Sequence, residues 1–190
     1  METHITLSIN NYTSSIPYPA SEREDSPHDG FKPLKGRPDE VPAIQAVQDN
    51  DALKLALVKI NGSATPFFTV ACRKSLNSAP EGCWVRGYIE FSFNYIGIAK
   101  DSPNYFLLFE QFNRFVLEAK FDLPVDFNFA VQGADFTDLS ASGYTACVWI
   151  TTAESPAMEG AHKAWNQSVG LLADFLAGFE KPPLPAIYES

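Results

Sequence analysis

The sequence lacks the features that secretion, membrane insertion or nucleic-acid binding would require. None of its 190 residues fall in an apolar run near the roughly 20 residues of a spanning helix. The first residues, METHITLSINNY, have no basic region followed by an apolar one, so we do not expect a secretory signal. The chain has only 14 Lys and Arg residues but 23 Asp and Glu residues, which gives a net charge of −9. This balance disfavours a phosphate backbone or an anionic membrane as partner.

Cysteine is also scarce. Cys72, Cys83 and Cys147 are odd in number and show no C-x-x-C spacing. We expect buried, free thiols in a reducing compartment, and therefore a cytoplasmic protein.

Motifs for catalysis or metal binding are missing too. The sequence has no nucleophile elbow, phosphate-binding loop, dinucleotide fingerprint or zinc-protease pattern. Glu159 and His162 have the E-x-x-H spacing of carboxylate-bridged metal sites, but the other main helical segment offers only Glu110 and Glu118 as partners. We interpret this spacing as a solvated helix face and predict no catalytic residue, metal or cofactor. The sequence favours binding over catalysis and leaves catalysis open.

What the sequence does contain is a single globular domain over residues 1–190. Hydrophobic residues make up 45% of the chain and include 15 Phe, enough for a substantial core. Apolar and polar residues alternate in several segments, which is typical of strands with one buried face. We predict strands over 4–9, 52–60, 66–73, 84–98, 126–132 and 144–152, and helices over 41–48, 103–119 and 156–179. The expected fold is α+β, an antiparallel sheet with helices packed on one face and a long C-terminal helix.

The predicted order is β-α-β-β twice, which a duplication would explain. Its weakest element is 52–60. Leu53, Leu55 and Leu57 alternate as in a strand, and Asn61 with Gly62 suits a hairpin turn. A helix would instead place Leu53, Leu57 and Ile60 on one face, so both interpretations stay open.

Both long helices follow a Ser-Pro pair. Ser102 and Ser155 suit the N-cap position, and Pro103 and Pro156 suit the first helical position. We therefore interpret this repeated motif as helix initiation and not as a shared active site.

Two segments stand outside this pattern. Residues 10–42 contain six prolines and form a proline-rich arm, either a disordered connector or a segment docked on a surface. Whether it packs on its own core or on a partner is open. Residues 180–190 form a tail with a short Pro-x-x-Pro pattern, which we expect to be frayed.

The second face of the predicted sheet gives the functional hypothesis. Trp84, Arg86, Tyr88 and Trp149 fall on the strand positions opposite the apolar stripes. A mixed aromatic and polar face with Arg is typical of an interface centre. We predict that these four residues bind a protein partner or a second subunit, or carry the docked arm. The corresponding function is a non-enzymatic protein-binding module, such as an inhibitor, immunity-type or assembly protein. The alternative is a small-molecule binding module with an apolar, aromatic pocket between the duplicated halves.

Overall fold

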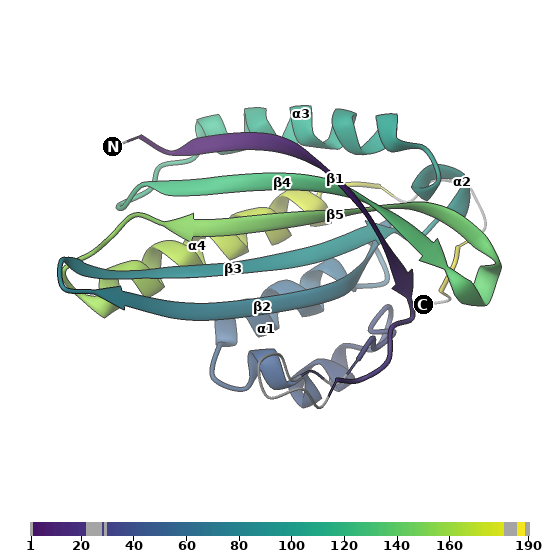
Figure 1. The fold of residues 1–190 in the computed structure, drawn as a ribbon, viewed down its shortest axis with the longest axis horizontal. Coiled ribbons are helices and arrows are strands. Elements are labelled where there is room, and N and C mark those ends of the chain that lie inside the picture. The colour runs from purple at the N-terminus through teal and green to yellow at the C-terminus, as the bar shows by residue number, and fades with distance from the viewer. Residues whose placement is uncertain (1, 22–27, 29, 181–185, 189–190) are drawn as a thin grey trace.

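The chain folds into one five-stranded sheet with helices on one side of it (Figure 1). The computed structural model describes residues 2–21, 28, 30–180 and 186–188. The strands are β1 (His4–Ile16), β2 (Phe67–Ala79), β3 (Gly82–Phe93), β4 (Val125–Phe136) and β5 (Ala141–Thr152). The helices are α1 (Asp51–Ile60), α2 (Ile96–Ala99), α3 (Ser102–Glu118) and α4 (Met158–Ala177), with short 3₁₀ helices η1 (Pro38–Ala43), η2 (Gln45–Val47) and η3 (Thr137–Leu139). The fold class α+β, with helices and a C-terminal helix, is confirmed.

The sheet is mixed and not purely antiparallel, which corrects the prediction. The strand order is β1-β4-β5-β3-β2, and β1 runs parallel to β4 while every other pair is antiparallel. A tight turn forces two strands to run antiparallel, as in the hairpins β2-β3 and β4-β5. β1 has no such turn, because residues 17–66 carry the chain from β1 to β2 at the opposite edge.

Alternation within the strands places one set of side chains under the helices. On β3, Val85, Ile89 and Phe91 are fully buried, and Phe127 with Phe129 continues this layer on β4. Figure 1 shows α4 behind the central strands, α3 along the β1 and β4 edge, and α1 behind β2. The core therefore lies between the sheet and these three helices.

The segment 52–60 is a helix, so the predicted strand there is wrong. The Asn50 side chain caps α1 by accepting a hydrogen bond from the backbone N–H of Leu53 at 3.1 Å. Leu53 and Leu57 are buried, whereas Leu55 is 67% exposed, as helical and not strand periodicity requires. The described part of the chain consequently has one strand fewer than predicted, and two complete β-α-β-β units do not fit it. A duplication stays a prediction.

Several boundaries also differ from the predictions. The expected helix over 41–48 is the pair of 3₁₀ helices η1 and η2, since Pro42 interrupts the helical hydrogen bonding. β3 ends at Phe93, and α2 (Ile96–Ala99) occupies the end of the strand predicted over 84–98. β4 and β5 extend towards each other and meet at a short turn where Ser140 has a φ of 49°.

The two Ser-Pro pairs differ in the structure. Asp101 is the N-cap of α3, and Ser102 is its first residue. The N-cap of α4 is Ala157, so Ser155 lies before the helix, where its backbone pairs with that of Cys83. The predicted N-cap roles of both serines are wrong. The two sequences look alike, but only one of them starts a helix directly.

The proline-rich arm packs on the protein's own core, at least in its described residues. Ile16, Leu34 and Val41 are buried with the core side chains. Lys35 is buried as well, and its ammonium donates hydrogen bonds to the carbonyl oxygens of Gly62 and Thr65. These contacts hold the arm against the end of α1 and the start of β2.

The described residues of the tail, 186–188, are docked rather than frayed. The backbone N–H of Ile187 donates to the carbonyl oxygen of Asn94 at 2.8 Å, and the Asn94 side chain bonds the backbone of Tyr188 on both sides. The Pro-x-x-Pro pattern lies outside the described residues. Within the described chain, no helix combines the length and apolar character that crossing a membrane demands.

Candidate functional site

The candidate site is the face of the sheet opposite the core, here called the outer face. The described helices pack on the other side (Figure 1). Residues directly opposite each other in the strand register share a face, so the register defines its members. They are His4, Thr6, Ser8 and Asn10 of β1; Asp126, Asn128, Ala130 and Gln132 of β4; Thr145, Cys147, Trp149 and Thr151 of β5; Trp84, Arg86, Tyr88 and Glu90 of β3; and Arg73, Ser75 and Asn77 of β2.

An aromatic and cationic stack occupies the middle of this face. The guanidinium carbon of Arg86 lies 4.6 Å from the centroid of the Trp149 ring, and the Tyr88 ring centroid is also 4.6 Å from it. Tyr88 and Trp149 are half-buried, whereas Arg86 is exposed. Three of the four residues predicted from sequence are therefore brought together. Trp84 lies on the same face, opposite Asn77 and near the start of β3. The binding role of all four stays a prediction.

Two shallow hollows flank the stack. One, of about 540 Å³, extends over β1, β4 and β5 and has Asp126, Asn128 and Trp149 in its lining. The other, of about 250 Å³, lies over β2 and β3. It is lined by Arg73, Ser75, Asn77, Arg86, Gly87 and Trp149. Arg86 and Trp149 line both hollows and separate them.

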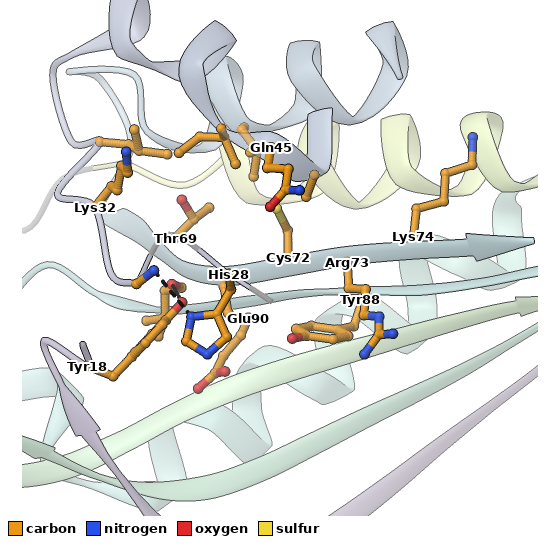
Figure 2. Close-up of a pocket in the computed structure, with 17 residues that line it drawn as sticks. Tyr18, His28, Lys32, Gln45, Thr69, Cys72, Arg73, Lys74, Tyr88 and Glu90 are labelled. Atoms are coloured by element: carbon orange, nitrogen blue, oxygen red, sulfur yellow. Dashed lines mark hydrogen bonds between the residues drawn. The ribbon is translucent and has the colours of Figure 1, made fainter. Parts of the chain in front are cut away.

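A deeper cleft of about 510 Å³ lies where the arm passes the edge strand β2 (Figure 2). Tyr18 and His28 of the arm lie on the same side of β2 as Glu90, and Gln45 of η2 lies on the other side. The arm is held there by a hydrogen bond from the Tyr18 hydroxyl to the Val70 carbonyl oxygen at 2.9 Å. No sequence pattern predicts this cleft, because its shape depends on how the arm packs.

Glu90 lies at the edge of this cleft and is almost fully buried. Its Oε1 accepts hydrogen bonds from the Thr145 hydroxyl at 2.7 Å and from Gln132 Nε2 at 2.8 Å. Gln132 Oε1 in turn accepts a bond from the Tyr12 hydroxyl at 2.5 Å. Burial raises the pKa of Glu90, and the two hydrogen bonds offset part of that rise. Glu90 is not among the four residues predicted from the sequence, although its strand parity is that of Arg86 and Tyr88.

Cys72, Cys147 and Tyr88 are poor nucleophiles in this setting. Burial raises the pKa of Cys72 to about 12 and that of Tyr88 to about 12, and it also raises the pKa of Cys147. These groups are protonated at neutral pH, whereas a nucleophilic thiol has to be ionised. All three cysteines are free thiols. Cys147 is buried as expected, whereas Cys72 and Cys83 are half-buried.

The histidine of the E-x-x-H pair on α4 contacts Lys74 of β2. His162 Nδ1 lies 3.0 Å from the ammonium nitrogen of Lys74, and Lys74 also lies over the Trp165 ring. Burial and the Lys74 charge lower the pKa of His162. In the described part of the chain, no group of three or more His, Cys, Asp or Glu side chains is placed to hold a metal ion.

Together these features define an α+β protein with a mixed sheet face that no described helix covers, and with an adjoining cleft. One end of this face is buried, at Gln132, Thr145 and Cys147. Comparison of the chain with models of known protein families, with curated proteins and with solved structures finds no match.

Proposed function

We propose that this chain is a non-enzymatic, cytoplasmic protein-binding module, of the inhibitor, immunity or assembly kind, that binds its partner on the outer face. The observation that best supports this proposal is the stack of Arg86, Trp149 and Tyr88 in the middle of a face that no described helix covers. Trp, Tyr and Arg are the residue types that most often dominate binding energy at interface centres.

The size of the face is suitable for a protein partner. Because the end of the face around Gln132 and Thr145 is buried, the accessible part covers about six residues on each of five strands. Strands lie about 4.8 Å apart and rise about 3.3 Å per residue, so this part spans about 24 by 20 Å. An area of about 480 Å² per partner is in the range of small, transient interfaces, which bury less than about 1,200 Å² in total.

Two ionisable groups of this face, the Tyr88 hydroxyl and the Cys147 thiol, are unsuited to acid–base or nucleophilic catalysis. A general acid or base works best with a pKa near the operating pH, and a nucleophile needs a nearby base. The Tyr88 hydroxyl and the Cys147 thiol have strongly raised pKa values. Among the described residues, neither group forms a hydrogen bond to a base. The three free thiols also suit a reducing compartment, which supports the proposed cytoplasmic location.

Partner capture followed by titration tests this function. Crosslinking and affinity capture from the native cell, with the wild-type chain as bait, would identify candidates for purification. Titration calorimetry of the purified pair should then show that Trp149→Ala with Tyr88→Ala weakens binding by about 1–4 kcal/mol, the usual range for residues that dominate an interface. The circular dichroism spectrum should stay that of the wild type.

Leu117→Ala is a matched control, because Leu117 is 74% exposed on α3, on the other side of the sheet. It should leave binding unchanged. Equal binding by the folded double variant would overturn the proposal, and so would turnover of a metabolite by the purified protein.

A second candidate function is small-molecule binding in the cleft beside the arm. Its volume of about 510 Å³ is within the range of ligand pockets. The predicted pocket was apolar and lay between duplicated halves, whereas this cleft has a mixed lining and lies between the arm and β2. Thermal-shift screening tests this second function. A small molecule that binds the cleft should raise the melting temperature of the wild type. It should not raise that of the variant Ala46→Trp, whose larger side chain fills the cleft.

A further inference from the structure

Two arginines lie next to each other on the outer face. Arg73 of β2 is opposite Tyr88, and Arg86 of β3 is opposite Ser75. They are therefore diagonal neighbours on the same face, within reach of each other's long side chains. Figure 2 shows Arg73 extending on the same side of β2 as Tyr88. Both arginines line the hollow of about 250 Å³.

Neither arginine has a counter-charge within the described chain. The ion pairs there are Arg37–Glu40, Lys59–Asp174, Arg114–Glu110 and Lys163–Asp122. Asp126 lines the neighbouring hollow with Arg86 but does not reach ion-pair distance, and Glu90 is buried with its Oε1 bonded to Thr145 and Gln132. Arg73 and Arg86 therefore repel each other without a neighbouring acidic group to offset the repulsion. This is notable because acidic residues are in excess in the chain, whose net charge is −9.

The pair is also arranged to accept an anion. Contact with the Trp149 ring holds the Arg86 side chain in place and reduces the entropy lost when it binds a ligand. Neither guanidinium donates a hydrogen bond to another described residue, so the donors of both face the hollow or the solvent. Arginine binds carboxylates with two parallel hydrogen bonds, which makes it a suitable carboxylate receptor.

We propose that Arg73 and Arg86 bind the carboxylates of an acidic segment in the protein partner. This inference rests on the proposed function, because it gives the chemistry of the partner that would occupy the outer face. A nucleic acid does not fit, since two arginines cannot offset the repulsion between a polyanion and a chain of net charge −9. An acidic segment needs only local complementarity, within the screening length of about 8 Å.

A short synthetic peptide tests the site without the partner. The probe is octaglutamate, with octalysine and an octamer of alternating Gly and Ser as controls, titrated into ¹⁵N-labelled protein at low salt. Octaglutamate alone should shift the indole N–H signal of Trp149, assigned with Trp149→Phe, and the shift should shrink as salt rises to 0.3 M. No shift at millimolar octaglutamate, or an equal shift with the neutral octamer, would overturn the proposal.

Variants decide which residues are responsible. Arg73→Gln with Arg86→Gln should weaken octaglutamate binding at least tenfold, and the double Lys variant should recover part of it, because charge is kept but bidentate geometry is lost. Arg114→Gln removes the same charge from α3 and should change nothing. Unaltered binding in the folded double Gln variant, or an equal loss with Arg114→Gln, contradicts the assignment.

The two proposals fail in different ways. If the identified partner needs Trp149 and Tyr88 but binds the double Gln variant normally, the protein-binding function stands and the acidic segment is wrong. If octaglutamate binds through the arginines but no protein binds through Trp149, the anion site stands and the protein-binding function is wrong.

Discussion

Asn61 Oδ1 accepts a hydrogen bond from the backbone N–H of Thr69 at 3.0 Å, which joins the end of α1 to the start of β2. The same side chain donates from Nδ2 to the Leu57 carbonyl oxygen at 2.8 Å and to the Thr69 hydroxyl at 2.7 Å. Asn61 therefore ends the helix and fixes the next strand, where the sequence had suggested a hairpin turn.

Replacing Asn61 with Ala should destabilise the fold by about 1–3 kcal/mol, because the buried N–H and hydroxyl of Thr69 lose their partner. The Leu57 carbonyl keeps the bond from the backbone N–H of residue 61. Urea denaturation followed by circular dichroism measures this change. Asn11→Ala, at an exposed position of β1, is the control and should stay within about 0.5 kcal/mol of the wild type. A loss below about 0.5 kcal/mol for Asn61→Ala would contradict this role.

The two leucines at 53 and 55 separate the helical and strand interpretations of residues 52–60. Leu53 is fully buried and Leu55 is 67% exposed. Leu53→Ala should cost about 2–5 kcal/mol of unfolding free energy, and Leu55→Ala should cost less than about 0.5 kcal/mol. A strand would place both on one face, so similar losses at the two positions would refute the helix.

At Gly87 the sheet packs closely against Trp165. A Cβ at this position would lie 2.7 Å from Trp165 Cζ2 and would also meet the Arg73 carbonyl oxygen. Gly87→Ala should therefore lower stability by at least about 1–3 kcal/mol through overpacking. Gly170→Ala is the matched control: no atom lies within 4 Å of its added Cβ, and removing a glycine from α4 should raise stability by about 0.5–1 kcal/mol. Equal effects of the two substitutions on the melting temperature would exclude the close approach.

The buried carboxyl of Glu90 should make stability depend on pH. Burial raises its pKa above the ordinary value of 4.5. Between that value and the folded pKa, the folded protein keeps a proton that the unfolded chain has released, so stability falls as pH rises through this window. Glu90→Gln removes this titration and still accepts both hydrogen bonds at Oε1.

Urea denaturation from pH 4 to pH 8 tests this. The variant should gain stability over the wild type as pH rises, whereas Glu154→Gln, at an exposed position, should show a constant difference. A constant difference in stability for Glu90→Gln as well would show that burial does not raise the pKa of Glu90.

Local periodicity was enough to predict much of the fold, and its failures have physical causes. The alternation of Val85, Ile89 and Phe91 identified a strand because one face is buried along its whole length. At 52–60 the leucines satisfied two periods at once, and the capping side chain of Asn50 decided between them. The parallel pairing of β1 could not be predicted, because strand partners far apart in sequence leave no local pattern.

The same limit applies to the candidate site. Alternation placed Trp84, Arg86, Tyr88 and Trp149 opposite the apolar stripes, because a strand's two faces can be separated by counting residues. Their mutual contacts depend on which strands are neighbours, and so does the pairing of Arg73 with Tyr88. The cleft beside the arm depends in addition on tertiary packing of an irregular segment.

The parallel pairing of β1 has a consequence for synthesis on the ribosome. Asn10 and Gln132, which hydrogen-bond across the β1-β4 pair, are 122 residues apart. The hairpins β2-β3 and β4-β5 close over short loops, but β1 has no partner until β4 has left the exit tunnel. Of the five described strands, β1 is made first and has to wait longest for a partner. Until β4 is made, Ile5, Leu7 and Ile9 stay without their sheet neighbours Phe127, Phe129 and Val131.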